Sequence, residues 1–193
     1  MSHIYFITHP EVTIDRAIPI TEWNLSLIGQ QRLEALITQP WMTTIEAIFA
    51  STERKARTTA ERIAYVRHLS ITYLTDLGEK DRSATGFLEP PAYRQLRDAF
   101  FAHPNASIQG WERAIDAQVR VLHAIEQAVG QTPASTNIAI ISHGGVGTLV
   151  LNHVQQMEIR KDDLPPGQGY YFIFATDTAK LIQHWKPIDE IGE

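Results

Sequence analysis

The sequence predicts an α/β protein of three layers, in which a mostly parallel, mixed sheet carries helices on both faces. Two observations predict this fold: apolar strand-like runs alternate with stretches of helical periodicity, and the last two strand-like runs flank a short polar turn. Repeated strand and helix units favour parallel strands, because each helix returns the chain to the same edge of the sheet. The final hairpin adds antiparallel pairing and makes the sheet mixed.

The first unit pairs a strand with a helix. Residues 4–8 are an apolar, β-favouring run, and we expect them to form the first strand. Residues 27–38 follow as a helix, because Leu33, Leu36 and Ile37 fall on one helical face.

A second unit repeats this order. Residues 47–50 are a short apolar strand, and Ser51 is the expected N-cap of the helix that follows. The apolar residues that recur at helical spacing in this helix are Ala56, Ala60 and Ile63.

The rest of the chain continues the alternation and ends in a hairpin. We expect residues 71–74 to form a third strand. Residues 137–142 are the most strand-like run of the chain, and they lead directly into a helix that begins at "HGG". Residues 170–175 and 181–185 flank "TDTAK" and predict the hairpin. Between the third and fourth strands we expect a long helix with an apolar stripe of Trp111, Ile115, Val119, Leu122 and Val129.

One segment interrupts this rhythm. Residues 78–110 contain a proline pair and one short helical stretch, residues 93–101. Inserts of this length in compact domains are typically lids or binding loops, although an inert surface excursion is the alternative. The aromatic side chains of this region either line a pocket or pack the insert: Phe87, Tyr93, Phe100, Phe101 and Trp111.

Composition narrows the class of protein. The chain has 193 residues, 44% of them hydrophobic and 20% charged, which predicts one globular domain over residues 1–193. It has no cysteine, so disulfides, thiolate metal sites and thiol catalysis are excluded. We expect a cytoplasmic protein without a membrane segment, because neither a signal peptide nor a long apolar run is present. The net charge of -5 and the scattered lysines and arginines argue against binding to nucleic acid or an anionic membrane.

Polar side chains with reactive groups follow the predicted strands. His9 follows the first strand, Ser51 and the basic "ERKAR" stretch follow the second, Glu79 lies beyond the third, and His143 follows the fourth. In open α/β sheets, ligands bind outside the carboxyl ends of the strands, so we expect these side chains to converge there. A single histidine in a loop is usually only solvated, but two at matching strand ends predict a site.

These residue types suit phosphoryl transfer. A histidine can be a nucleophile, cationic or N–H donors stabilise the phosphoryl oxygens, and a carboxyl group can supply a proton to the leaving oxygen. The "SHGG" turn opens a helix, and we expect its unpaired backbone N–H groups, including that of Gly144, to face an anion.

The motifs resemble the histidine phosphatase superfamily, which includes the cofactor-dependent phosphoglycerate mutases. Its Arg-His-Gly motif corresponds to Thr8, His9 and Pro10, and its Ser-His-Gly-Gly motif is intact at residues 142–145. The other corresponding residues are Leu25, Ser26 and Gly29 at a helix start, Ser51, Lys55, Ala56, Thr59 and Ala60 after the second strand, and Leu77 and Glu79 after the third. The resemblance implies a phosphoglycerate mutase-like fold.

The resemblance also implies roles for four side chains. His9 would be the nucleophile that becomes phosphohistidine, and Glu79 the general acid for the leaving oxygen and later the base for water. His143 would hydrogen-bond the transferring phosphoryl group, and Lys55 would take the place of a phosphate-binding arginine. The substrate would be a small phosphorylated molecule, no cofactor or metal is implied, and the sequence makes no prediction of the oligomeric state.

The phosphate pocket departs from this pattern on one side. Thr8 and Lys55 replace arginines, and Pro10 replaces glycine and removes an N–H group. Losing one preorganised oxyanion donor typically costs about 3 to 4 kcal/mol of transition-state stabilisation. The cations close enough in sequence to compensate are Arg16, Arg54 and Arg82, and solvated surface charges are the alternative interpretation of each.

We therefore predict a phosphomonoester hydrolase, slow or atypical, that works through His9. The main alternative is a catalytically inactive family member that binds an anion or has a regulatory role. An esterase is disfavoured because the chain has no Gly-x-Ser-x-Gly elbow, and "GGVGTL" lacks the context of a dinucleotide fingerprint. A metal hydrolase lacks a recognisable spacing of ligands, and a mutase would need more cations for a second phosphate.

Overall fold

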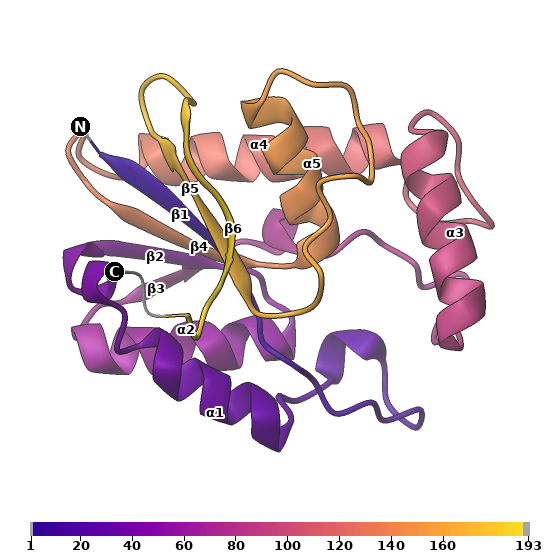
Figure 1. The fold of residues 1–193 in the computed structure, drawn as a ribbon, viewed down its shortest axis with the longest axis horizontal. Coiled ribbons are helices and arrows are strands. Elements are labelled where there is room, and N and C mark those ends of the chain that lie inside the picture. The colour runs from indigo at the N-terminus through magenta and orange to yellow at the C-terminus, as the bar shows by residue number, and fades with distance from the viewer. Residues whose placement is uncertain (1, 191–193) are drawn as a thin grey trace.

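The computed structural model describes residues 2–190, which form a six-stranded sheet between layers of helices (Figure 1). The strands are β1 (His3–Thr8), β2 (Ala47–Ala50), β3 (Ile71–Tyr73), β4 (Ile138–Ser142), β5 (Tyr170–Ala175) and β6 (Leu181–Pro187). Their order is β3-β2-β4-β1-β5-β6. The first four are parallel, β5 is antiparallel to β1, and β6 is antiparallel to β5. The predicted mixed, mostly parallel sheet is confirmed.

Helices cover both faces of this sheet, as predicted. The α-helices are α1 (Leu27–Leu36), α2 (Arg54–Arg67), α3 (Pro90–Ala102), α4 (Ala114–Gly130) and α5 (Gly144–Val154). Short 3-10 helices are η1 (Ile20–Glu22), η2 (Pro40–Thr44) and η3 (Thr75–Leu77). Figure 1 shows α1 and α2 on one side of the sheet, α4 and α5 on the other, and α3 beyond the end of α4. Among the helices within residues 2–190, none has both the length and the hydropathy that crossing a bilayer requires.

Alternation along the strands creates two apolar cores. On β4, Ile138 and Ile140 pack with α4 and α5, whereas Ala139 and Ile141 pack with α1 and α2. Successive side chains of a strand point to opposite faces, so a fully apolar strand serves both layers. Each fully buried Ile or Phe side chain contributes roughly 1.5 to 3 kcal/mol of transfer free energy.

The structure corrects the predicted face of α4. Val119 is 62% exposed, and Trp111 lies before the helix begins. The buried face consists mainly of small residues: Ala114, Ala117, Val121, Ala124, Ile125 and Ala128. Alanines allow α4 to lie close to its neighbours. The periodicity of large apolar residues therefore predicted a stripe that lies partly outside the buried face of the helix.

A second correction concerns the start of α2. Glu53, not Ser51, is the N-cap residue. The Ser51 hydroxyl instead accepts a hydrogen bond from the Glu53 backbone N–H at 3.2 Å. This turn directs Ser51, Glu53 and the first turn of α2 toward the carboxyl edge of the sheet.

The register of the parallel strands brings their ends together. Thr8 pairs with Ser142, and Ala50 pairs with Ile141. The backbone N–H of His9 continues this pattern by donating to the Ser142 carbonyl at 3.2 Å. Residues that follow β1, β2 and β4 therefore emerge at one edge.

The insert at residues 78–110 is joined to the segment before α4. The Trp111 indole donates to the Thr85 hydroxyl at 2.8 Å, and the Glu112 backbone N–H donates to the Asp81 carbonyl at 2.9 Å. The sequence left open whether the five aromatic residues of this region line a pocket or pack the insert. Phe100, Phe101 and Trp111 are buried in the core, while Phe87 and Tyr93 line a cavity.

Candidate active site

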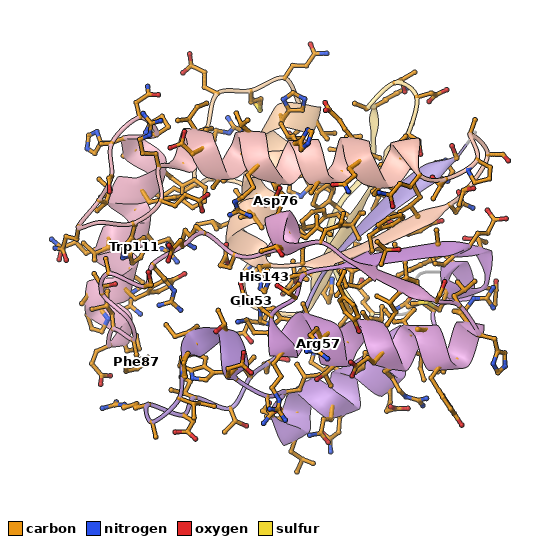
Figure 2. All side chains as sticks on the ribbon, turned by 180° about the vertical axis from the view of Figure 1, so that it is seen from behind. Glu53, Arg57, Asp76, Phe87, Trp111 and His143 are labelled. Atoms are coloured by element: carbon orange, nitrogen blue, oxygen red, sulfur yellow. The ribbon has the colours of Figure 1, made fainter. Side chains whose placement is uncertain are left out.

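A cavity of about 1020 Å³ lies at the carboxyl edge of the parallel strands. His9, His143, Glu53, Lys55 and Glu79 line its inner end. Figure 2 shows His143 and Glu53 beside each other near the strand ends, with Phe87, which also lines the cavity, across from them. The strand ends thus converge on one site, as the sequence predicted.

His9 is held in one tautomer. Its Nδ1 atom lies 2.8 Å from the Pro10 carbonyl oxygen, which can only accept, so Nδ1 carries the proton and Nε2 keeps its lone pair. Burial, followed by the nearby His143 and Lys55, lowers the pKa of His9 to about 3. The imidazole is therefore neutral near pH 7. Pro10 removes an N–H group compared with glycine, but its carbonyl orients the His9 ring.

His143 lies against His9, with ring centroids 5.2 Å apart. Its Nε2 atom is 2.9 Å from the Ser51 hydroxyl and 3.4 Å from a Glu53 carboxylate oxygen. The other ring nitrogen, Nδ1, is buried and has no hydrogen-bond partner among residues 2–190. Burial lowers the pKa of His143, although Glu53 opposes this shift, so the ring is neutral. A proton on Nε2, facing the carboxylate, leaves Nδ1 as a bare acceptor.

Glu53 is the functional residue that the sequence interpretation missed. Its carboxylate accepts a short hydrogen bond from the Lys55 ammonium and another, at 2.8 Å, from the Glu79 backbone N–H. Burial raises the pKa of Glu53, but His143 and Lys55 lower it more, to about 2. The only signal in the sequence was a carboxylate two residues before the motif lysine.

Lys55 lies where the resemblance placed a cation, but its charge is already paired. The side chain is 4% exposed, and its ammonium also donates to the Ile20 carbonyl at 3.0 Å. Glu53 and Lys55 therefore form a buried ion pair at the inner end of the cavity.

Glu79 reaches the site but is bound to the start of α5. Its carboxylate accepts hydrogen bonds from the backbone N–H groups of Gly145 and Val146, both at 3.1 Å, and of Lys80 at 3.0 Å. Burial raises the pKa of Glu79, but the Lys80 charge, His143 and these donors hold it well below its usual range. The expectation that the "SHGG" amides stand unpaired is therefore wrong for Gly145 and Val146. The Gly144 amide has no acceptor within residues 2–190.

The three arginines proposed to compensate for Thr8 occupy different places. Arg82 lines the cavity with its guanidinium 4.9 Å from the Tyr93 ring centroid, and no carboxylate within residues 2–190 pairs with it. Arg16 lines the outer end, where it pairs with Glu89. Arg54 is exposed and is not part of the cavity wall. Arg54 is therefore not a residue of this site.

Thr8 has a structural role at the position of the motif arginine. Its hydroxyl donates to the Tyr170 carbonyl at 3.1 Å and accepts from the Tyr170 N–H at 2.9 Å. It is buried and joins the end of β1 to the start of β5.

Comparison with known proteins identifies the family. The sequence model of the Histidine phosphatase superfamily (branch 1) matches residues 4–169. The chain belongs to this superfamily. Several solved structures share the fold over nearly the whole chain, while no curated protein sequence matched.

Three of these solved structures illustrate the likeness. YhfR of Bacillus stearothermophilus is 20% identical with a TM-score of 0.76, covering 100% of this chain and 98% of its own. A mycobacterial glucosyl-3-phosphoglycerate phosphatase in complex with inorganic phosphate is 16% identical with a TM-score of 0.72, covering 96% and 95%. The phosphoserine phosphatase of Entamoeba histolytica in complex with 3-phosphoglyceric acid is 13% identical with a TM-score of 0.75, covering 98% and 100%. At these identities, the likeness shows the shared fold.

Proposed function

We propose that this histidine phosphatase relative hydrolyses a small phosphomonoester through a covalent phosphohistidine at His9. The observation that carries the proposal is the fixed, neutral imidazole: the Pro10 carbonyl holds Nδ1–H, so Nε2 is a free nucleophile at the inner end of the cavity. A residue that served only to bind an anion would be more effective as a charged donor. The inorganic phosphate bound in one similar structure and the 3-phosphoglyceric acid bound in another support this substrate class.

The other residues are assigned by their contacts. His143 faces His9 and is proposed to hydrogen-bond the transferring phosphoryl group through Nδ1. Lys55 and the Gly144 amide would donate hydrogen bonds to its oxygens, and Arg82 and Arg16 would contact the outer part of the substrate. The insert at residues 78–110 would shape the side of the leaving group, as a lid or a wall.

The reaction proceeds in two displacements. First, His9 Nε2 forms a bond to phosphorus while the bond from phosphorus to the leaving oxygen breaks, and that oxygen takes up a proton. Water then attacks the phosphohistidine, releasing phosphate and restoring His9. An ionised Glu79 suits the second step, in which it would accept the proton of the attacking water.

Turnover of a panel of phosphomonoesters by wild type and His9→Ala tests the proposal. We expect His9→Ala to lower kcat by about a thousandfold or more, because no other group in the site replaces the nucleophile. His123→Ala is the matched control, since His123 is exposed on α4 far from the cavity wall. Equal rates for wild type and His9→Ala would contradict the proposal.

A second function is favoured by a specific observation. The Lys55 ammonium and the Gly145 and Val146 amides, which should bind phosphate, are already bound to carboxylates. A non-catalytic anion-binding or regulatory protein is consistent with such a site. It predicts phosphate binding with neither turnover nor covalent labelling of His9.

A further inference from the structure

The reacting end of the cavity has ionised groups but no unpaired charge. Lys55 is bound to Glu53, and Lys80 lies 3.6 Å from a Glu79 carboxylate oxygen. His9 and His143, which face these pairs, are neutral. A doubly charged phosphoryl group would thus meet a site whose formal charges cancel, with the Glu53 carboxylate beside it. Repulsion between like charges a few ångströms apart is large in a buried site, and it grows with the charge of the ligand.

No carboxyl group at this end can supply the proton that the leaving oxygen requires. Both carboxylates are bound by donors: Glu53 by the Lys55 ammonium and an amide, and Glu79 by three amides. These contacts stabilise the ionised form of each group. The first displacement therefore needs another source of the proton.

The unpaired nitrogen of His143 indicates that source. Nδ1 is an acceptor without a partner, on a ring that is 0% exposed and lies 5.2 Å from the His9 ring. A fully ionised phosphoryl group has only acceptors to offer it. A phosphoryl group that keeps one proton offers an O–H donor, which matches a bare imidazole nitrogen.

We propose that Glu53 is a specificity-determining residue that makes the site select the singly charged form of a phosphomonoester, which brings the proton for its own leaving group. The inference rests on the proposed function. In the first displacement, the bond from His9 Nε2 to phosphorus forms, the bond to the leaving oxygen breaks, and the proton of the phosphoryl O–H moves to that oxygen. The products are an alcohol and a phosphohistidine, and total charge is conserved.

The substrate is the group that titrates near neutral pH in this scheme. The charged or titratable groups that face Glu53 are Lys55 on α2, His143 before α5, and His9 after β1. Glu79 contributes its backbone N–H to Glu53, and its carboxylate is held ionised by α5 and Lys80. A phosphomonoester loses its second proton near pH 6, so the singly charged form becomes about tenfold rarer with each pH unit above that.

Binding of inorganic phosphate, measured by calorimetry, tests the selection without requiring turnover. Wild type should bind phosphate about sevenfold more tightly near pH 5.5 than near pH 8, because inorganic phosphate loses its second proton near pH 7 and its singly charged fraction falls by about that factor between the two pH values. Glu53→Gln should lose or reverse this preference, since Lys55 is then free to meet the dianion. Glu61→Gln, an exposed residue of the same helix, should retain it.

Each result is decisive. Wild type binding that is unchanged or tighter near pH 8 overturns the proposal, as does a Glu53→Gln variant that keeps the wild-type preference. If Glu53→Gln does not fold, the pH dependence of wild type still decides whether the site selects the singly charged ligand.

Turnover of an alkyl phosphate separates this proposal from the proposed function. We expect kcat/KM for ethyl phosphate to fall about tenfold per pH unit above about pH 6 in wild type, and to fall less steeply in Glu53→Gln. Phosphate binding with the predicted pH dependence but no turnover would refute the proposed function and keep the charge selection. Turnover with a preference for the dianion would support the proposed function and overturn the charge selection.

Discussion

Thr8 shows how a single replacement changes the role of a motif position. Where the superfamily motif has arginine, the Thr8 hydroxyl makes two hydrogen bonds to the backbone of Tyr170. A threonine cannot bind phosphate as a guanidinium does, but it is short enough to join two strand ends inside the fold. The position thus has a structural role. Any catalytic activity would depend on His9, His143 and Glu79.

Replacing Thr8 by valine tests this role. Valine has the same shape but leaves the Tyr170 N–H and carbonyl groups without their partner, so we expect the free energy of unfolding to fall by about 1 to 3 kcal/mol. Urea denaturation measures the change. Thr72→Val is the control, because Thr72 is exposed on β3, and valine is favourable in a strand. Equal stability of Thr8→Val and wild type would show that the two hydrogen bonds contribute nothing.

Several site residues could be predicted from their places in the sequence, and one could not. His9, Glu79 and His143 follow strands, and strand ends of a parallel sheet converge whatever the details of packing. Glu53 was missed because its position depends on the turn before α2, where the N-cap side chain points back to the strand ends. Hydrophobic periodicity carries no information about that direction. The pairing of Glu79 with the α5 amides was hidden for the same reason.

The start of α5 is the element on which the site is built. Glu79, from the segment after β3, caps this helix by binding its first amides, so the helix dipole stabilises a carboxylate of the chain itself. Gly145 makes this possible. A Cβ atom there would lie 2.5 Å from a Glu79 carboxylate oxygen and 2.6 Å from the Lys80 ammonium.

Gly145→Ala should displace Glu79 from the helix. We expect it to lower the free energy of unfolding by about 1 to 3 kcal/mol through overpacking, and to reduce turnover as well. Gly130→Ala is the matched control: its Cβ would meet nothing within 4 Å, so alanine in α4 should be neutral or stabilise by up to about 1 kcal/mol. Urea denaturation and steady-state rates measure both variants. A Gly145→Ala protein as stable and active as Gly130→Ala would contradict this account of the site.

The elements themselves were largely predictable. Apolar runs bounded by polar turns located the strands within a residue or two, because a strand buried on both faces must be apolar throughout. The buried face of α4 was harder, since it consists largely of alanines, which periodicity in large residues does not detect.

At the level of the whole molecule, the topology of the sheet positions the side chains of the site. β4 lies between β1 and β2, so His143 emerges between the segments that carry His9 and Glu53. The strand order could not be predicted from the sequence, because the central neighbours β2 and β4, β4 and β1, and β1 and β5 are not consecutive in the chain. The insert at residues 78–110 adds Arg82, Phe87 and Tyr93 to the outer part of the same cavity. One cavity thus joins an inner end whose formal charges cancel to an outer end lined by Arg82, Phe87 and Tyr93.

Trapping of the covalent intermediate tests the central claim most directly. Wild type and His9→Ala would be incubated with a phosphomonoester, quenched in alkali and digested, and the peptides analysed by tandem mass spectrometry. The account predicts an acid-labile phosphoryl group on His9 of the wild type and none on the His9→Ala protein. Hydrolysis of the substrate without any label on His9, or with the label on another residue, would contradict it.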